Sequence, residues 1–169
     1  MSDKILVAYA TKHGATAEIA EKIGEVVRES GQDVAVFPVK DVKDISPYST
    51  VILGSAVYMG AWRREAGAFL KANEISLSQK KVWLFSSGPT GKGDIKSLLK
   101  DWTFPRGLKD LAERIKPRGH EIFRGDLRED KMGGFERWVI KKVKAPLGDF
   151  RDWEVVAGWA RSITDELKK

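Results

Sequence analysis

Cysteine is missing from all 169 residues of the chain, and this absence excludes several kinds of chemistry. Without cysteine the chain can form no disulfide, ligate no iron–sulfur cluster and use no thiol nucleophile. The only two histidines, His13 and His120, lie far apart in the sequence. A zinc site built from histidine and cysteine is therefore not expected, and we predict no metal site.

Long hydrophobic runs are also missing, and the longest apolar stretches are far shorter than a membrane span. The chain begins Met-Ser-Asp with no charged-then-apolar leader after it, so we expect no export signal and a cytoplasmic protein. Hydrophobic residues make up 42% and charged residues 32%, as is ordinary for globular proteins. We predict a single domain over residues 1–169.

Acidic residues are fewer than basic ones, which leaves a net charge of +6 and a sequence pI near 9.5. This balance favours an anionic partner, although many proteins are mildly basic for no specific reason. The sequence contains neither an aromatic RNA-binding strand signature nor a finger spacing. We therefore predict no nucleic-acid partner.

Short apolar runs alternate with stretches of helical periodicity along the chain. Ile19, Ile23, Val26 and Val27 mark a helix that starts near Thr16, and Gly31 marks its end. The predicted strands are 4–9, 33–37, 48–57, 81–86 and 120–127. Further helices are predicted over 63–74, around 108–115 and over 153–167, the last with Asp152 as N-cap.

This alternation predicts an α/β fold: a doubly wound, five-stranded parallel sheet of order 2-1-3-4-5, with helices on both faces. Ligands of such sheets bind at the carboxyl ends of the strands, near the switch between strands 1 and 3. Loops 10–16, 54–62 and 86–94 follow three strands there and are rich in Gly, Ser and Thr. These loops are the predicted ligand site.

The first loop has the composition of a phosphate cradle. Thr11, Thr16 and the backbone amides from Lys12 to Ala15 can surround a phosphate, and Gly14 lets the backbone approach it. The loop has neither the Gly-Lys-Ser/Thr ending of a Walker loop nor the three glycines of a dinucleotide loop. The alternative is purely structural, with Thr16 as a helix N-cap and Gly14 in a tight turn.

The three loops together resemble those of the flavodoxins. "ATKHGAT" is similar to the flavodoxin phosphate loop Thr-x-x-Gly-x-Thr, and "ILGSAVYMGAW" and "LFSSGPTGKGD" stand where the second and third flavin loops are. The resemblance implies flavin mononucleotide (FMN) as cofactor, with a Gly60 carbonyl turned toward flavin N5. The implied contacts are Thr11, Lys12, His13, Gly14, Ala15, Thr16, Ser55, Ala56, Val57, Tyr58, Met59, Gly60, Ser86, Ser87, Gly88, Thr90 and Gly91.

One branch of that family, the menaquinone-dependent protoporphyrinogen oxidases, is more similar still. The stretches "GSAVYMG", "RWVIKKVK" and "DWEVVAGWARSI" carry this likeness, whereas "KAPLGDFRDW" departs from the branch. The resemblance implies flavin-based oxidation of protoporphyrinogen with menaquinone as acceptor, and no catalytic side chain. Two alternatives are an electron-transfer flavodoxin that serves another redox protein and a flavodoxin-fold module without flavin.

Several single residues also have predicted positions. Tyr58 is predicted beside the flavin ring, and Trp62 either flanks the ring or packs inside. His120 is expected to cap or open the fifth strand and not to be a ligand, and Arg124-Gly125-Asp126 is expected to be the exit from that strand. Lys92 and Asp94 are expected in solvent.

Residues 131–151 are predicted to form a partly helical, basic and aromatic insertion after strand 5, because so long a connection is uncommon. On a helix Phe135, Trp138, Val139 and Lys142 share a face. Two interpretations remain open: an anionic membrane surface on the inner face bound through Lys141, Lys142 and Lys144, or a helix packed on the sheet. We expect Trp138 itself in the core.

Overall fold

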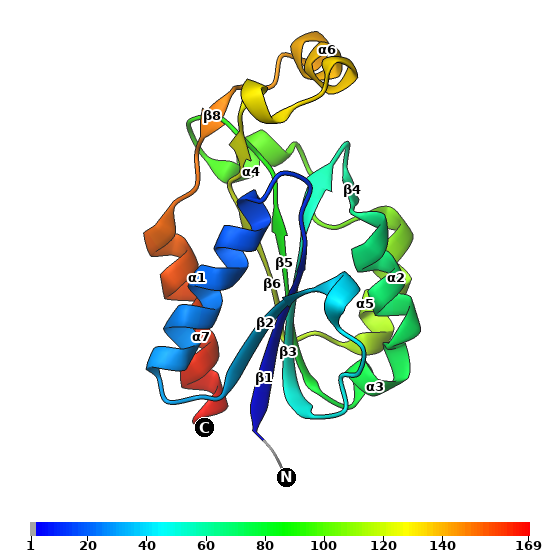
Figure 1. Ribbon diagram of the computed structural model, residues 1–169, viewed down its shortest axis with the longest axis vertical. Helices are drawn as coiled ribbons and strands as arrows, with labels where there is room; N and C mark the ends of the chain where they lie inside the picture. Colours follow the sequence, from blue (N-terminus) through cyan, green and yellow to red (C-terminus); the bar gives the residue numbers. More distant parts are fainter. Residues whose placement is uncertain (1–2) are drawn as a thin grey trace.

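The computed structural model describes residues 3–169, and its centre is a twisted parallel sheet (Figure 1). The strands run in the order β2-β1-β3-β5-β6, which confirms the predicted fold class and the order 2-1-3-4-5. Their bounds are β1 Lys4–Ala10, β2 Val34–Pro38, β3 Tyr48–Tyr58, β5 Lys81–Ser87 and β6 Gly119–Phe123. A short strand β4, Ala61–Trp62, folds back antiparallel onto the end of β3.

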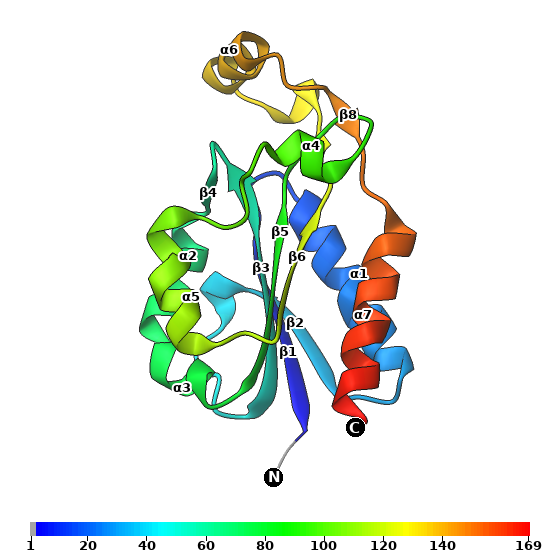
Figure 2. The same cartoon turned by 180° about the vertical axis from the view of Figure 1, so that it is seen from behind.

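Helices cover both faces of the sheet (Figures 1 and 2). α1, Ala15–Glu29, and α7, Trp153–Leu167, lie on one face; α2, Arg64–Ala72, α3, Glu74–Ser78, and α5, Lys109–Ile115, lie on the other. Successive side chains of a strand point to opposite faces. Ile5 and Val7 of β1 accordingly pack in the α1/α7 cluster, and Leu6 and Ala8 pack in the α2/α5 cluster.

The ends of the two long helices follow the sequence signals. The Asp152 side chain accepts hydrogen bonds from the backbone N–H groups of Glu154 (3.1 Å) and Val155 (3.3 Å), which confirms the N-cap of α7. α1 ends at Glu29, and Gly31 follows with a positive φ of 93°. These signals are local, and this is why the sequence alone predicts them.

One predicted helix is confirmed within two residues, and one predicted strand is divided in the structure. The helix predicted over 63–74 is α2, which ends before Asn73, whose side-chain amide donates to the Phe69 carbonyl at 2.9 Å; the short helix α3, which was not predicted, follows it. The strand predicted over 120–127 stops at Phe123, whose parallel partner is Ser87, the last residue of β5. After Phe123, β6 has no residue of β5 to pair with, so the strand ends there.

The chain from residue 124 to residue 152, here called the excursion, leaves the end of the sheet and returns to α7 (Figure 1). Its elements are β7 Asp126–Leu127, the 3₁₀ turn η3 Glu129–Lys131, α6 Gly134–Val143 and β8 Gly148–Asp149. β7 and β8 pair with each other in an antiparallel ladder. The remaining elements are the 3₁₀ turns η1 Val39–Asp41 and η2 Arg106–Leu108, and helix α4 Ile95–Leu99.

The excursion is partly helical, as predicted, but α6 stands away from the sheet (Figures 1 and 2). Trp138 is 57% exposed and Phe135 is 79% exposed, so the expectation of Trp138 in the core is wrong. A helix that stands away from the sheet has no core in which to bury an indole. In residues 3–169, no helix is long and apolar enough to span a membrane.

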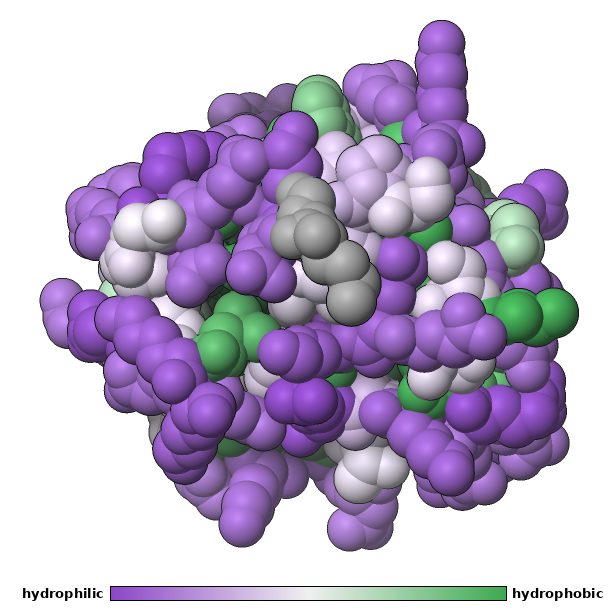
Figure 3. Space-filling view, turned by 90° about the horizontal axis from the view of Figure 1, so that it is seen from below, coloured by the Kyte–Doolittle hydropathy of each residue, from purple (hydrophilic) through white to green (hydrophobic). Residues whose placement is uncertain are grey.

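The opposite end of the molecule differs in character. Seen from below, the end away from α6 is mostly hydrophilic, with only small and scattered hydrophobic areas (Figure 3). The exposed aromatic pair of α6, whose rings stack at a centroid distance of 6.1 Å, therefore belongs to the end where the predicted ligand loops lie.

Candidate cofactor site

The three Gly/Ser/Thr-rich loops meet at the carboxyl ends of β1, β3 and β5, as predicted, and enclose a small cavity of about 70 Å³. The start of the excursion closes its remaining side. The lining residues are Lys12, His13, Ala15, Ala56, Val57, Tyr58, Ser87, Gly88, Thr90, Gly125, Asp126 and Leu127.

The first loop is built around Gly14. Its φ is 95°, a left-handed conformation that costs glycine little, and its N–H donates to Thr11 Oγ1 at 2.9 Å. A Cβ at this position would have no atom within 4 Å, so the space beside Gly14 is open. The N–H groups of the first turn of α1 have no partner within the helix and carry its positive dipole end.

The helix begins at Ala15 with Gly14 as its N-cap, so the alternative reading of Thr16 as the N-cap is wrong. Thr16 lies in the first turn, and its side chain is 1% exposed. The structure thus places Thr11, Gly14 and Thr16 around one helix start, which is the arrangement that a phosphate cradle needs.

A carboxylate from the excursion reaches this loop. Glu136 of α6 is hydrogen bonded to His13 Nε2 at 2.6 Å and forms an ion pair with Lys12. The Lys12 ammonium also lies 4.0 Å from the centre of the Tyr58 ring. Burial raises the pKa of Glu136, but hydrogen bonds from Lys12 and His13 outweigh burial and hold this pKa below its ordinary value.

This four-residue cluster was not foreseen from the sequence, because Glu136 lies 123 positions from His13. One signal was present: Glu136 is the only acidic residue of the basic stretch 131–144. In the same cluster, burial and the Glu136 charge raise the pKa of Tyr58, so its phenol stays protonated at neutral pH.

The second loop turns sharply after Tyr58. Met59 and Gly60 both have positive φ, 53° and 79°, and Met59 is 82% exposed. The Gly60 carbonyl accepts a hydrogen bond from the Trp102 indole Nε1 at 2.9 Å. Whether this carbonyl meets flavin N5 stays a prediction, and any such contact must compete with Trp102.

Not every predicted contact residue offers a side chain to the cavity. The Ser55 hydroxyl is buried, accepting from the Arg63 N–H at 3.0 Å and donating to the Ala56 carbonyl at 2.9 Å. Trp62 is 6% exposed and donates to Ser86 Oγ at 2.8 Å. Of the two predicted positions of Trp62, beside the flavin ring or packed inside, the structure therefore shows the packed position.

Ser86 faces the interior on the same side as Trp62. Its hydroxyl is within hydrogen-bond distance of His120 Nε2, 2.9 Å, and its exposed fraction is 0%. Burial lowers the pKa of His120 to about 4, so the imidazole is neutral at physiological pH. The pair contains a hydroxyl and a base, but the hydroxyl is fully buried, so the pair serves packing between β5 and β6.

The third loop is tied to the exit from β6. Gly91 has a φ of 116°, and its carbonyl accepts from Arg124 Nη1 at 2.8 Å. Gly125 runs so close to Gly88 that a Cβ would lie 2.9 Å from the Gly88 carbonyl oxygen. Arg124-Gly125-Asp126 is thus the strand exit, as predicted. Lys92 and Asp94 are exposed, also as predicted.

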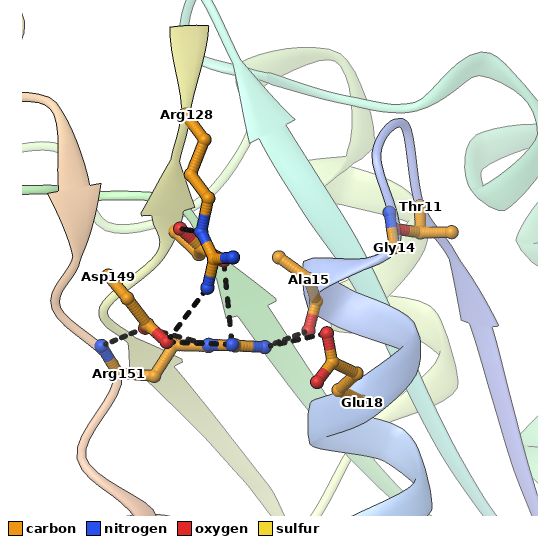
Figure 4. A network of polar contacts seen from close by, with 8 residues as sticks. Thr11, Gly14, Ala15, Glu18, Arg128, Asp149 and Arg151 are labelled. Atoms are coloured by element: carbon orange, nitrogen blue, oxygen red, sulfur yellow. Dashed lines mark hydrogen bonds and ion pairs between the residues drawn. The ribbon is translucent and has the colours of Figure 1, made fainter. Parts of the chain in front are cut away.

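An arginine-centred network holds the returning end of the excursion against α1 (Figure 4). Arg151 donates to Asp149 from Nε at 2.9 Å and from Nη2 at 2.8 Å, and to the Ala15 carbonyl from Nη1 at 3.4 Å. These hydrogen bonds lower the pKa of Asp149 to about 2. Arg151 also lies 3.5 Å from Asp126, whose carboxylate is buried beside the cavity.

The helix start fits the phosphate end of FMN, because the space beside Gly14 is open and Thr11 lies next to it; Thr16 is 1% exposed, and neither threonine lines the cavity. The cavity itself is well below the roughly 300 Å³ at which small-molecule sites begin. A flavin ring therefore needs more space than this cavity offers in the structure.

Comparison with known proteins agrees with the predicted resemblance. Residues 6–153 match a family model described as "Flavodoxin domain". A curated relative from Escherichia coli K12, "Protoporphyrinogen IX dehydrogenase [quinone]", is 22% identical over 171 residues, covering 95% of this chain and 94% of the relative.

Two solved structures show the same fold over nearly their whole length. An archaeal flavodoxin superposes with a TM-score of 0.66 at 16% identity, covering 98% of this chain and 99% of that one. A single-site mutant of a Pseudomonas aeruginosa flavodoxin superposes with a TM-score of 0.63 at 10% identity, with coverage of 98% and 99%. At such identities the likeness concerns the fold.

Proposed function

The chain belongs to the flavodoxin domain family, and from this premise we propose that it is an FMN-binding redox protein. The observation that carries the proposal is the first loop: an open, left-handed Gly14 at the start of α1, between Thr11 and Thr16. It lies at the switch between β1 and β3, where ligands of such sheets bind.

Different residues of the chain would bind the phosphate and the ring of FMN. The first loop holds the phosphate through backbone N–H groups and the two threonine hydroxyls, helped by the dipole of α1. Tyr58 and the Met59–Gly60 turn flank the ring on one side, and Ser87 to Gly91 flank it on the other. FMN, when bound, supplies one- and two-electron transfer, and the protein contributes binding, orientation and water exclusion.

Titration of the protein, freed of any bound flavin, with FMN and separately with riboflavin tests this proposal. FMN should bind with a shifted visible spectrum and quenched fluorescence, and riboflavin should bind at least about tenfold more weakly because it lacks the phosphate. Equal affinities for the two flavins would contradict the role of the first loop, and binding of neither would favour a flavodoxin-fold module without flavin.

A finer proposal concerns the reaction. We propose that the loaded protein oxidises protoporphyrinogen and passes the electrons to a quinone, with the E. coli relative's name and the net charge of +6 as support. Its alternative is an electron-transfer flavodoxin that serves another redox protein. Anaerobic mixing with protoporphyrinogen and menaquinone separates them: only the first predicts porphyrin formation that depends on quinone.

We also propose that α6 meets an anionic membrane surface, where a quinone would be found. Phe135 and Trp138 are exposed and stacked, and the Lys142 ammonium lies 4.9 Å from the Trp138 ring. Aromatic rings with adjacent lysines suit the headgroup region, where the rings bury partly and the lysines meet anionic lipid.

A further inference from the structure

A second and larger hollow lies on the other side of the Met59–Gly60 turn. Its volume is about 630 Å³, and it runs between α2 and the segment that leads through η2 into α5. Small residues create it: Gly67 and Ala68 on α2 and Gly107 in η2 leave space where larger side chains would fill the gap. We call this hollow the α2 groove.

The charge of the α2 groove has one sign. Arg63, Arg64 and Lys71 line it from α2 and its N-cap, Arg106 lines it from η2, and no aspartate or glutamate is among its lining residues. Arg63 lies 3.3 Å from Glu65. Among the side chains that the structure describes, none of the other three cations has an ion pair. Uncompensated cations on two separate elements attract an anion with more than one negative group.

The α2 groove also has an apolar wall. Trp62, Pro105 and Leu108 contribute buried apolar surface, and the half-buried indole of Trp102 stands at the rim. That indole donates to the Gly60 carbonyl at 2.9 Å. The turn predicted to flank the flavin is therefore also a wall of the groove, so a molecule bound here would lie next to the cofactor site.

We propose that the α2 groove binds an amphipathic polycarboxylate, and that this is the site of the organic substrate; the second part rests on the proposed function. The apolar body packs on Trp102 and Leu108, and separated carboxylates pair with Arg64, Lys71 and Arg106. A single compact phosphate fits less well, because the cations are spread over two elements. A porphyrinogen, an apolar macrocycle with two propionates, has the required chemistry.

The probe for this proposal is mesoporphyrin IX, a stable dicarboxylate, with its dimethyl ester as the uncharged control. The variant Arg64→Glu/Arg106→Glu reverses two groove charges. Both side chains are exposed, and Arg64 is the first residue of α2, where an acidic residue favours the helix. Lys43→Glu/Lys81→Glu makes the same change in net charge at exposed positions outside the groove.

We expect the groove variant to bind mesoporphyrin at least about tenfold more weakly than the wild type, and the control variant to bind within about twofold. The dimethyl ester should bind weakly to all three proteins. Ala68→Trp, which fills the hollow without changing charge, should also weaken binding. Thermal melting of each variant shows whether it is folded.

FMN titration of the same proteins separates this inference from the proposed function. If FMN binds normally while mesoporphyrin binds the groove variant and the control variant equally, or the ester binds as tightly as the acid, the groove proposal is overturned. If charge-dependent mesoporphyrin binding is found in a protein that binds no FMN, the groove stands as a binding site and the proposed function fails.

Discussion

The body of the molecule and the excursion are held together by different forces. Two apolar clusters, one on each face of the sheet, hold the body; Leu6, Leu53 and Leu70 lie in one, and Ile19 and Phe85 in the other. The excursion is attached largely through polar contacts, with Glu136 on Lys12 and His13 at one point and Arg151 on Glu18 and the Ala15 carbonyl of α1 at another. The stabilisation from buried apolar area depends little on pH and on moderate salt, whereas the stabilisation from ion pairs depends on both.

From this difference we expect that the excursion can change its position without unfolding the body. Among the large hydrophobic residues of the excursion, Met132 is buried and several are half-buried, but Phe135, Trp138, Val143 and Leu147 are exposed. The proposed binding of a flavin ring requires the small cavity to widen, and the excursion is the part that we expect to move. Charged contacts near the first loop then link that movement to the cofactor site.

The largest expected effect tests the body. Phe85→Ala removes a fully buried ring that packs against Phe123 and Trp159 and should lower the free energy of unfolding by about 3–5 kcal/mol. Trp138→Ala, the matched aromatic truncation in the excursion, should change it by less than about 0.5 kcal/mol. Urea denaturation measures both, and similar losses would mean that α6 is part of the core.

Next in size is the membrane contact of the excursion. Charge reversal at Lys141, Lys142 and Lys144 should weaken binding to anionic liposomes by at least about 3 kcal/mol, since each lysine near such a surface contributes about 1 kcal/mol and each new carboxylate is repelled. Sedimentation with vesicles at low and high salt measures this. FMN affinity serves as the control and should stay constant. Absence of liposome binding by the wild type at low salt would refute the membrane surface.

A change of similar or smaller size is expected in the first loop. Thr16→Val removes the hydroxyl but keeps the shape and should weaken FMN binding by about 1.5–3 kcal/mol, the contribution of a hydrogen bond to a charged group. Riboflavin affinity should hardly change, because riboflavin has no phosphate. The proposed phosphate role is excluded if FMN affinity is the same in both proteins.

The smallest expected effect concerns the attachment of α6. Glu136→Gln keeps the shape but loses the charge that faces Lys12 and His13, which should favour local opening of α6 by about 1 kcal/mol. Hydrogen exchange of residues 134–143 measures the opening, with the exposed Glu113→Gln as control. No change in exchange would show that other contacts hold α6.

The same attachment should depend on pH in a defined direction. The pKa of Glu136 in the folded protein lies below its ordinary value of 4.5. The stabilisation is therefore present above about pH 4.5 and is lost as the pH falls through the lowered pKa. The opening equilibrium of α6 in the wild type, obtained from exchange rates corrected for the pH dependence of intrinsic amide exchange, should shift toward the open form with acid in that range, and the shift should be absent in Glu136→Gln.

Much of the body follows from the sequence because its determinants are local. The apolar runs fall within a few residues of β1, β2, β3 and β5, and the order 2-1-3-4-5 is the observed order. The bounds of α7 and its Asp152 cap were also predicted. Strand periodicity and capping involve residues that are neighbours in the chain, so each can be read without the rest of the fold.

Tertiary structure alone decided the details at the candidate site. β6 ends at Phe123 because its partner strand β5 ends at Ser87. Trp138 is exposed because α6 stands away from the sheet. Three contacts join residues from separate elements: Trp62 with Ser86, Trp102 with Gly60, and Glu136 with His13 of the first loop. Such contacts form only when segments that are distant in the sequence pack together, and the local sequence around each residue does not specify its partner.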